Sequence, residues 1–301
     1  MCRKAQGIEE VTVGSHLLTR FSVVLLLSLE ALAGSASSPS TKGSFYAIRR
    51  DSFLAAPQHE LSGPVELLQQ LYQQAEQFIN LLDWVYFDEE LPPPAERYNR
   101  RKHFGTWIDD PTDSDCYDTR AKVLVRDSKV SVTFSPTNQC LVAEGVWDEP
   151  YLPTTHTLAR DIQIDHLVPL ADSYRNGAWR WDQETRCAYA NFQGNGYHLL
   201  AVDGRANMRK SDKTPEGWMP ANLAFSCTYL RYWLSIKMVW GLTMTASEAQ
   251  AIENHLQARG CDPETMRMPV PELKRLEAVI AKTRQICRQV GTLREGRSLQ
   301  P

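Results

Sequence analysis

The sequence lacks the signals of several large protein classes. Its 301 residues contain no internal repeat, no Asn-x-Ser/Thr glycosylation site and no Cys-x-x-Cys spacing of the kind that zinc sites use. Gly194-Asn-Gly196 is followed by no third glycine and no helix pattern, so it is not a phosphate-binding loop. The formal net charge of −3 shows no overall excess of positive charge. A local positive field can still attract a polyanion, so this charge does not exclude binding to nucleic acid.

The composition is that of a globular protein behind a targeting segment. Hydrophobic residues make up 43% and charged residues 23% of the chain, which is long enough to bury a sizeable core. Phe21–Leu29 is an apolar run of signal-peptide length that follows Arg20. Glu30 and the long leader weaken this pattern, and a buried or disordered leader is the alternative. We expect residues 1–36 to be a signal peptide and the mature protein to be secreted. After residue 36, no segment is long and apolar enough to cross a membrane.

Six cysteines remain after residue 36. An even number without zinc-site spacing predicts disulfide bonds and an oxidising compartment, in agreement with secretion. The alternative is six reduced cysteines in a cytosolic enzyme, which the leader disfavours. Six cysteines allow 15 connectivities, and the residues alone leave the choice open.

Two apolar segments carry polar residues that suggest a reaction. The first, 161–170, is a short strand with Asp165-His166 at its end, and the second, 199–202, leads through a glycine turn to Asn207. His166, with an unperturbed pKa of about 6.5, can serve as a base near neutral pH. Asp165 and Asn207 offer hard oxygen ligands, which suit Mg²⁺ better than Zn²⁺. The basic residues that follow either pair with phosphates or form a solvated helix face: Arg209, Lys210 and Lys213.

Such a set, meeting at one point, suits a divalent metal, an activated water and a phosphodiester. Its order along the chain resembles the ββα-metal motif of HNH endonucleases, with Asp165-His166 on a strand, then His198, then Asn207 nine residues later. From about Tyr98 to Cys261 the context is similar to secreted HNH nucleases related to the C-terminal nuclease module of GmrSD-type restriction enzymes. The segments that carry this resemblance are Ile164–Leu170, Trp179, Tyr189–Asn191, Leu199–Val202, Lys210–Lys213 and Pro215–Trp218.

The resemblance implies an α+β fold, in which a ββα-metal (HNH) core follows short strands and is flanked by helices. His166 would be the general base, and Asp165 with Asn207 would hold the metal, Mg²⁺ or alternatively Mn²⁺. His198, counted with His166 among the catalytic residues, would stand where many relatives carry an asparagine that orients the loop or the base. A histidine can donate a hydrogen bond in that role, and a ligand role is the alternative. Asn191 departs from the Asn-Asp pair expected there. No nucleotide cofactor is implied.

The resemblance, together with the order of the cysteines, also suggests a set of disulfide bonds. Two pairs follow from it, Cys116–Cys140 and Cys227–Cys261, and the pair that remains is Cys187–Cys287.

We divide the chain into a signal peptide (1–36), a linker with an amphipathic helix (37–94), the HNH nuclease domain (95–262) and a basic C-terminal helix and tail (263–301). The amphipathic helix is expected over 64–82. Short strands are expected at 122–125, 130–134 and 140–147, although the first could instead extend a helix that begins near Thr119. Later helices are expected at 223–240, from a Thr245–Glu248 capping box to Gly260, and at 272–290.

Two basic clusters lie outside the motif. Arg97–Lys102 interleaves four basic residues with a tyrosine, and residues 272–301 hold seven basic and three acidic side chains. Each cluster is either a solvated face or an accessory contact for a polyanion.

The sequence therefore predicts a secreted, metal-dependent endonuclease that cleaves DNA, with RNA as an alternative substrate, and with little sequence specificity. The competing hypothesis is a secreted, non-catalytic binding or effector protein that retains the HNH scaffold. No membrane partner is expected, and the sequence leaves the oligomeric state open.

Overall fold

The computed structural model describes residues 78–84 and 91–298, with side chains for 78–83 and 91–291. All of these belong to one compact unit, Gln58–Pro301. The predicted signal peptide, the linker and most of the predicted helix at 64–82 lie outside the described residues.

Two antiparallel strands and a helix form the centre of the unit. β5 (Ile162–His166) pairs with β6 (Leu199–Asp203) so that His166 lies opposite Leu199. α8 (Gly204–Lys210) follows β6 without a loop. Asp203 makes this possible because its carboxylate accepts a hydrogen bond from Ala206 N at 2.7 Å and caps the first turn. The order is strand, strand, helix.

A small sheet packs on one side of this centre. It consists of β2 (Thr133–Ser135), β3 (Asn138–Glu149) and β4 (Thr154–Leu158), in that order and antiparallel. Helix α5 (Thr119–Asp127) joins it to the centre, since Trp147 Nε1 donates to Leu124 O at 2.9 Å. The apolar side chains between them form a separate small core: Val123, Leu124, Trp147, Ala159, Ile162, Ile164, Leu199 and Ala201.

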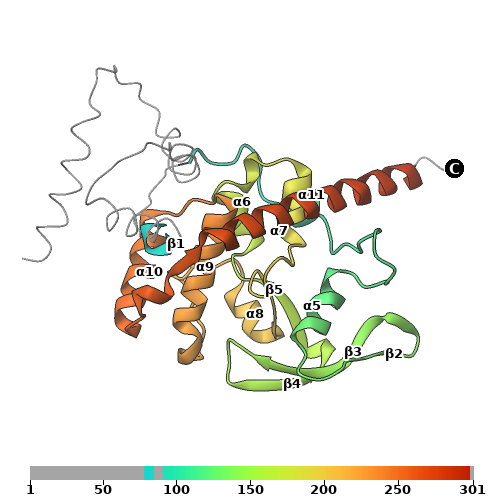
Figure 1. Cartoon of the computed structure of the whole chain (residues 1–301), viewed down its shortest axis with the longest axis horizontal. Coiled ribbons are helices and arrows are strands. Elements are labelled where there is room, and N and C mark those ends of the chain that lie inside the picture. Colours follow the sequence, from blue (N-terminus) through green and yellow to red (C-terminus); the bar gives the residue numbers. More distant parts are fainter. Residues whose placement is uncertain (1–77, 85–90, 299–301) are drawn as a thin grey trace, which may run out of the picture. The chain divides into compact units, whose positions relative to one another are not determined.

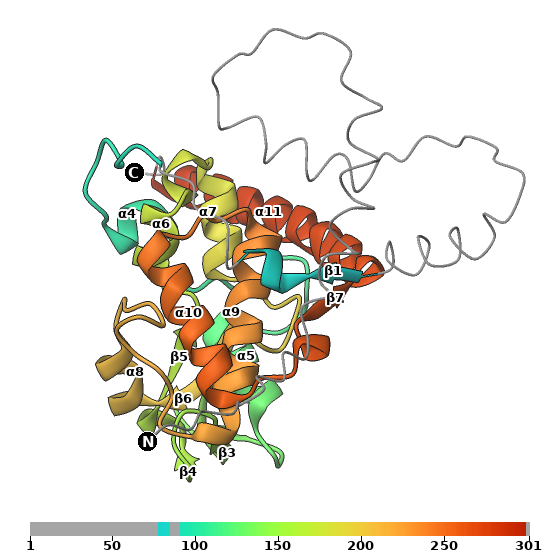
Figure 2. The same cartoon turned by 90° about the vertical axis from the view of Figure 1, so that its left-hand side faces the viewer.

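Helices cover the other side and enclose the larger core. They are α4 (Arg100–Phe104), α6 (Leu170–Arg175), α7 (Gln183–Ala190), α9 (Ser226–Trp240), α10 (Ala246–Arg259) and α11 (Val270–Ser298). Figures 1 and 2 both place α9 and α10 side by side, with α11 against α7 and the β2–β4 sheet at the far end. Short 3-10 turns lie between the strands and helices: η2 (Leu81–Trp84) after β1, η3 (Ala159–Asp161) before β5, η4 (Ala178–Arg180) before α7, η5 (Leu223–Phe225) before α9 and η6 (Pro263–Thr265) before β7. None of the helices in the described part has the length and apolar character needed to cross a bilayer.

Three local predictions are corrected. The end of the predicted 64–82 helix is wrong, because Phe78–Asn80 is strand β1 and pairs with β7 (Arg267–Pro269). Residues 122–125 belong to α5, which is the alternative given above, since Asp118 caps that helix through Ala121 N. The strand predicted at 130–134 begins at Thr133.

The helix opened by Thr245 has only half of the expected capping box. Thr245 Oγ1 accepts from Glu248 N at 3.2 Å, and Gly260 ends the helix in the left-handed region with φ 60°. The Glu248 side chain does not return to Thr245. It is buried and bonds to Lys237 Nζ at 2.9 Å and to Trp233 Nε1 at 2.7 Å, which joins α10 to α9.

Three disulfide bonds join the pairs suggested above. Cys116–Cys140 ties the loop before α5 to β3, and Cys227–Cys261 ties α9 to the segment after α10. Cys187–Cys287 joins α7 to α11 over a sequence separation of 100. Ion pairs at 2.8 Å and 2.9 Å, from Arg284 to Asp182 and from Arg288 to Glu184, reinforce that contact. Two basic side chains of the C-terminal cluster therefore form ion pairs with acidic residues of this same chain.

We predict that the bond with the longest loop contributes most to stability. In the chain-entropy treatment, a cross-link over 100 residues stabilises by about 4–5 kcal/mol and one over 24 residues by about 3 kcal/mol. The double variant Cys187→Ala/Cys287→Ala should therefore melt at a lower temperature than Cys116→Ala/Cys140→Ala. Calorimetry of both variants beside the wild type measures this order, and the reverse order would contradict it.

Candidate active site

Asp165 and His166 leave β5 on opposite faces, as successive residues of a strand do. Asp165 lies on the face that α8 covers. His166 lies on the face of Ile162 and Ile164, which belongs to the small core. The two side chains therefore contact different partners and do not meet at one point, which corrects the expected convergence.

Asp165 is part of a buried network. Its Oδ1 accepts from Lys210 Nζ at 2.9 Å, and its Oδ2 accepts from Tyr151 Oη at 2.5 Å. Lys210 Nζ also donates to the backbone oxygen of His166 at 3.0 Å. Lys210 and Tyr151 are fully buried and Asp165 is 5% exposed. Burial raises the pKa of the Asp165 carboxyl, and the charge of Lys210 opposes that shift.

This geometry conflicts with two expected roles. A divalent cation at Asp165 Oδ1 would have to take the place of the Lys210 ammonium, so Asp165 does not fit a metal ion in this conformation. Lys210 in turn has no exposed surface with which to meet a phosphate. Asn207, the other expected ligand, donates from Nδ2 to Gln163 Oε1 at 2.9 Å on the same face of β5.

The other two predicted phosphate-binding residues, Arg209 in the last turn of α8 and Lys213 just after it, are at the surface. Arg209 and Lys213 are exposed, and Lys213 Nζ donates to Arg209 O at 2.8 Å. These two side chains are accessible to a phosphate, in contrast to Lys210.

His166 is held by a backbone carbonyl. Its Nε2 lies 2.9 Å from Ala190 O, at the C-terminal end of α7. Because a carbonyl only accepts, Nε2 carries the proton and Nδ1 is the basic nitrogen. Burial lowers the pKa of His166 well below its usual value, and the nearby His198 and Arg100 act in the same direction. The ring is therefore neutral at neutral pH, as a general base must be.

His198 contacts the end of α7 and the start of the loop after β5, next to His166. Its Nε2 lies 2.7 Å from Tyr189 O, and its own backbone oxygen accepts from Leu167 N at 3.1 Å. Its ring is edge-on to that of His166, with centroids 6.3 Å apart. Burial lowers the pKa of His198 to about 3. These contacts hold the start of the loop after β5.

The structure adds residues that the motif did not reveal. Trp107 stacks on His166, and Tyr151 closes the Asp165 network. Asn191 accepts from Ile108 N at 3.1 Å and donates to Thr106 O at 3.3 Å, so it fixes the backbone on both sides of Trp107. Only Asn191 had a signal in the sequence, through its place in the Tyr189–Asn191 segment.

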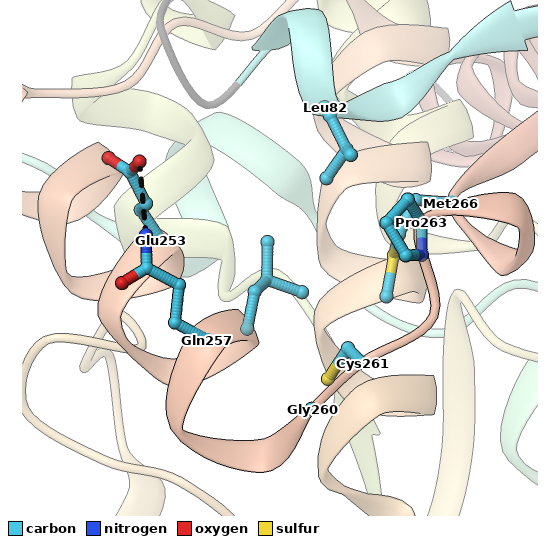
Figure 3. A pocket seen from close by; sticks show the side chains of 8 residues that line it. Leu82, Glu253, Gln257, Gly260, Cys261, Pro263 and Met266 are labelled. Carbon is cyan, nitrogen blue, oxygen red and sulfur yellow. Dashed lines mark hydrogen bonds between the residues drawn. The ribbon is translucent and has the colours of Figure 1, made fainter. Parts of the chain in front are cut away.

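Two other features lie apart from this chemistry. Among the described residues, Asp109, Asp113 and Asp115 are the carboxylates close enough to share a cation, but Lys122 Nζ is 2.6 Å from Asp113 and 3.5 Å from Asp115. An apolar groove lies between η2, the end of α10 and η6 (Figure 3). Gln257 Nε2 donates to Glu253 Oε1 at 3.4 Å at its edge, and none of the predicted catalytic, metal-binding or phosphate-binding residues lines it.

The fold and these contacts define an α+β protein with a buried, backbone-held histidine at the end of a strand–strand–helix unit. Residues 119–254 match the family described as GmrSD restriction endonucleases, C-terminal domain. An "Uncharacterized secreted protein" of Arthroderma benhamiae is 38% identical over 164 residues, which cover 54% of this chain and 76% of that protein. The chain belongs to the GmrSD C-terminal domain family, which points to a nuclease-like function. No solved structure matches the chain.

The buried ion pair gives a stability prediction. Lys210→Met removes the ammonium and leaves Asp165 buried without its cation, so the free energy of unfolding should fall by about 3–5 kcal/mol. The same substitution at the exposed Lys213 is the control and should change stability little. Urea unfolding followed by circular dichroism measures both, and a loss below about 1 kcal/mol in Lys210→Met would contradict the buried pair.

The depressed pKa of His198 predicts a pH dependence of stability. The unfolded chain binds a proton at His198 below about pH 6.5, whereas the folded protein does so only near 3. The contribution of His198 to the free energy of unfolding is therefore fully present above about pH 6.5 and is lost as the pH falls toward 3. His198→Asn keeps a donor for Tyr189 O but does not titrate. Urea unfolding at several pH values between 6.5 and 3 should show a smaller fall in the free energy of unfolding for the variant than for the wild type. Identical slopes of this free energy against pH would refute the depressed pKa of His198.

Proposed function

We propose that the protein is a secreted endonuclease that hydrolyses phosphodiester bonds in DNA, with RNA as a further substrate, and uses His166 as its general base. The observation that carries this proposal is the bond between His166 Nε2 and Ala190 O. It leaves Nδ1 free of a proton in a ring that is neutral at neutral pH. A base of this kind can take a proton from water in the step that forms the new phosphorus–oxygen bond.

Among the described residues, those around His166 orient its ring and do not place a charged side chain in direct contact with it. Ala190 fixes the tautomer, Trp107 covers one ring face and His198 holds the loop that follows β5. The water proton passes to Nδ1 while the water oxygen attacks phosphorus, and the departing oxygen of the cleaved strand leaves on the opposite side. Arg209 and Lys213, both exposed, are available to neighbouring phosphates.

The nuclease family implies a divalent metal, for which Mg²⁺, with Mn²⁺ as the alternative, is the ion expected from Asp165 and Asn207. The Lys210 ammonium at Asp165 Oδ1 takes the position that such an ion would need, so Asp165 does not fit the ion in this conformation. Cleavage of plasmid DNA by the purified protein, with added Mg²⁺ or with a chelator, measures the requirement directly.

Secretion is supported by two observations. The relative from Arthroderma benhamiae is named a secreted protein, and six cysteines form three disulfide bonds. Such bonds persist in oxidising compartments.

One observation favours the alternative of a non-catalytic binding protein. His166 is only 6% exposed and Asp165 is neutralised by Lys210, so this conformation does not present an open catalytic centre. The same plasmid assay separates the two functions, because a binding protein would shift the plasmid in a gel without cutting it.

We predict that His166→Ala lowers the cleavage rate by about 10²–10⁴-fold, the usual contribution of a general base. His255→Ala is the matched control, because His255 Nε2 also lies beside a backbone carbonyl, Pro215 O, at 3.1 Å. Single-turnover plasmid cleavage measures the rates, and circular dichroism checks the fold. Near-native cleavage by a folded His166→Ala protein would remove His166 from the base role.

A further inference from the structure

Trp107 contacts both the proposed base and a surface arginine. The Arg100 guanidinium carbon lies 5.4 Å from the Trp107 ring centroid. The Trp107 ring is nearly parallel to that of His166, at 7°, with centroids 5.2 Å apart. Arg100 is exposed, Trp107 is half-buried and His166 is buried. The cation of Arg100 and the imidazole of the proposed base therefore both pack on one indole ring.

The end of α7 positions both the indole and the imidazole. Ala190 O holds His166 Nε2 at 2.9 Å. The next residue, Asn191, bonds to the backbone on either side of Trp107 and also donates to Cys187 O at 3.0 Å. Trp107 is thus fixed relative to His166 by the same short segment that fixes the imidazole.

Arg100 differs from Lys102, Lys122 and Lys210 in its partners. Lys102 Nζ is 2.5 Å from Glu96, Lys122 is paired with Asp113, and Lys210 is buried against Asp165. In the described part of the chain, no carboxylate lies within ion-pair distance of Arg100, and its guanidinium contacts the face of Trp107. An exposed cation–π contact is weak beside a charge-assisted hydrogen bond to a phosphate, so an incoming phosphate can recruit this guanidinium.

We infer that Arg100 and Trp107 complete the site at His166, with Arg100 contacting a backbone phosphate of the nucleic acid and Trp107 acting as the positioning residue for the His166 ring. This inference rests on the proposed function. It places the phosphate that Arg100 contacts on the α4 side of β5, whereas Arg209 and Lys213, in and just after α8, could meet only phosphates further along the strand.

Arg100→Ala tests the phosphate contact, and Arg267→Ala is its control. Arg267 is also an arginine, and it makes a surface ion pair with Glu264 at 2.8 Å. Binding of a fluorescent DNA duplex is measured by anisotropy in chelator over a range of salt concentrations. Arg100→Ala should weaken binding about ten- to a hundredfold and reduce the slope of log affinity against log salt by about 1. Arg267→Ala should match the wild type.

Trp107→Ala and Trp107→Phe test the positioning role. Trp107→Ala should lower kcat about tenfold or more with little change in KM, because a misplaced base costs rate more than substrate affinity. Trp107→Phe keeps an aromatic ring on His166 and should retain most of kcat. A purely structural role would instead lower the melting temperature of Trp107→Ala without this split between kcat and KM.

The outcomes separate this inference from the proposed function. Equal binding and equal salt slopes in Arg100→Ala and Arg267→Ala would overturn the phosphate contact, and an unchanged kcat in a folded Trp107→Ala protein would overturn the positioning role. If the wild type binds DNA through Arg100 but does not cut it, the phosphate contact stands and the nuclease function fails.

Discussion

A buried ammonium holds the centre of this protein together. Lys210 Nζ bonds at once to the Asp165 carboxylate and to the His166 carbonyl, so the last turn of α8 is fixed to the end of β5. Water solvates neither charged group, since Lys210 is fully buried and Asp165 is 5% exposed. The His166 side chain can leave the opposite face in a defined direction because the backbone beneath it is held in this way. An ion pair of this kind contributes less to net stability than to a unique arrangement of the strand and helix.

The second organising element is the C-terminal end of α7. Ala190 and Asn191 are adjacent, yet one holds the His166 imidazole and the other holds the backbone around Trp107. The candidate site is thus assembled from three segments far apart in the sequence: residues 100–108, the end of β5 and the end of α7. None of these segments carries the site alone.

Local chemistry made much of the fold predictable. The apolar strands at β5 and β6, the Thr245 cap and the Gly260 stop all have short-range signals, and each is present in the structure. Strand β1 could not be predicted in this way because its partner β7 lies near the other end of the unit. The site was predictable only as a list of residues. The alternation of side chains along a strand already places Asp165 and His166 on opposite faces. Their partners could not be predicted in this way, because Lys210 lies 45 positions from Asp165 and Trp107 lies 59 positions from His166.

The bond between Cys187 and Cys287 has a consequence for the order in which the protein is made. The loop that it closes contains β6, α8, α9 and α10, and Asn191, four residues beyond Cys187, also lies within it. Synthesis from the N-terminus delivers β5, Ala190 and His198 long before the sulfur atom that secures α7. The helix end that orients His166 is therefore covalently anchored only after the chain has been made as far as Cys287, and only where thiols can be oxidised.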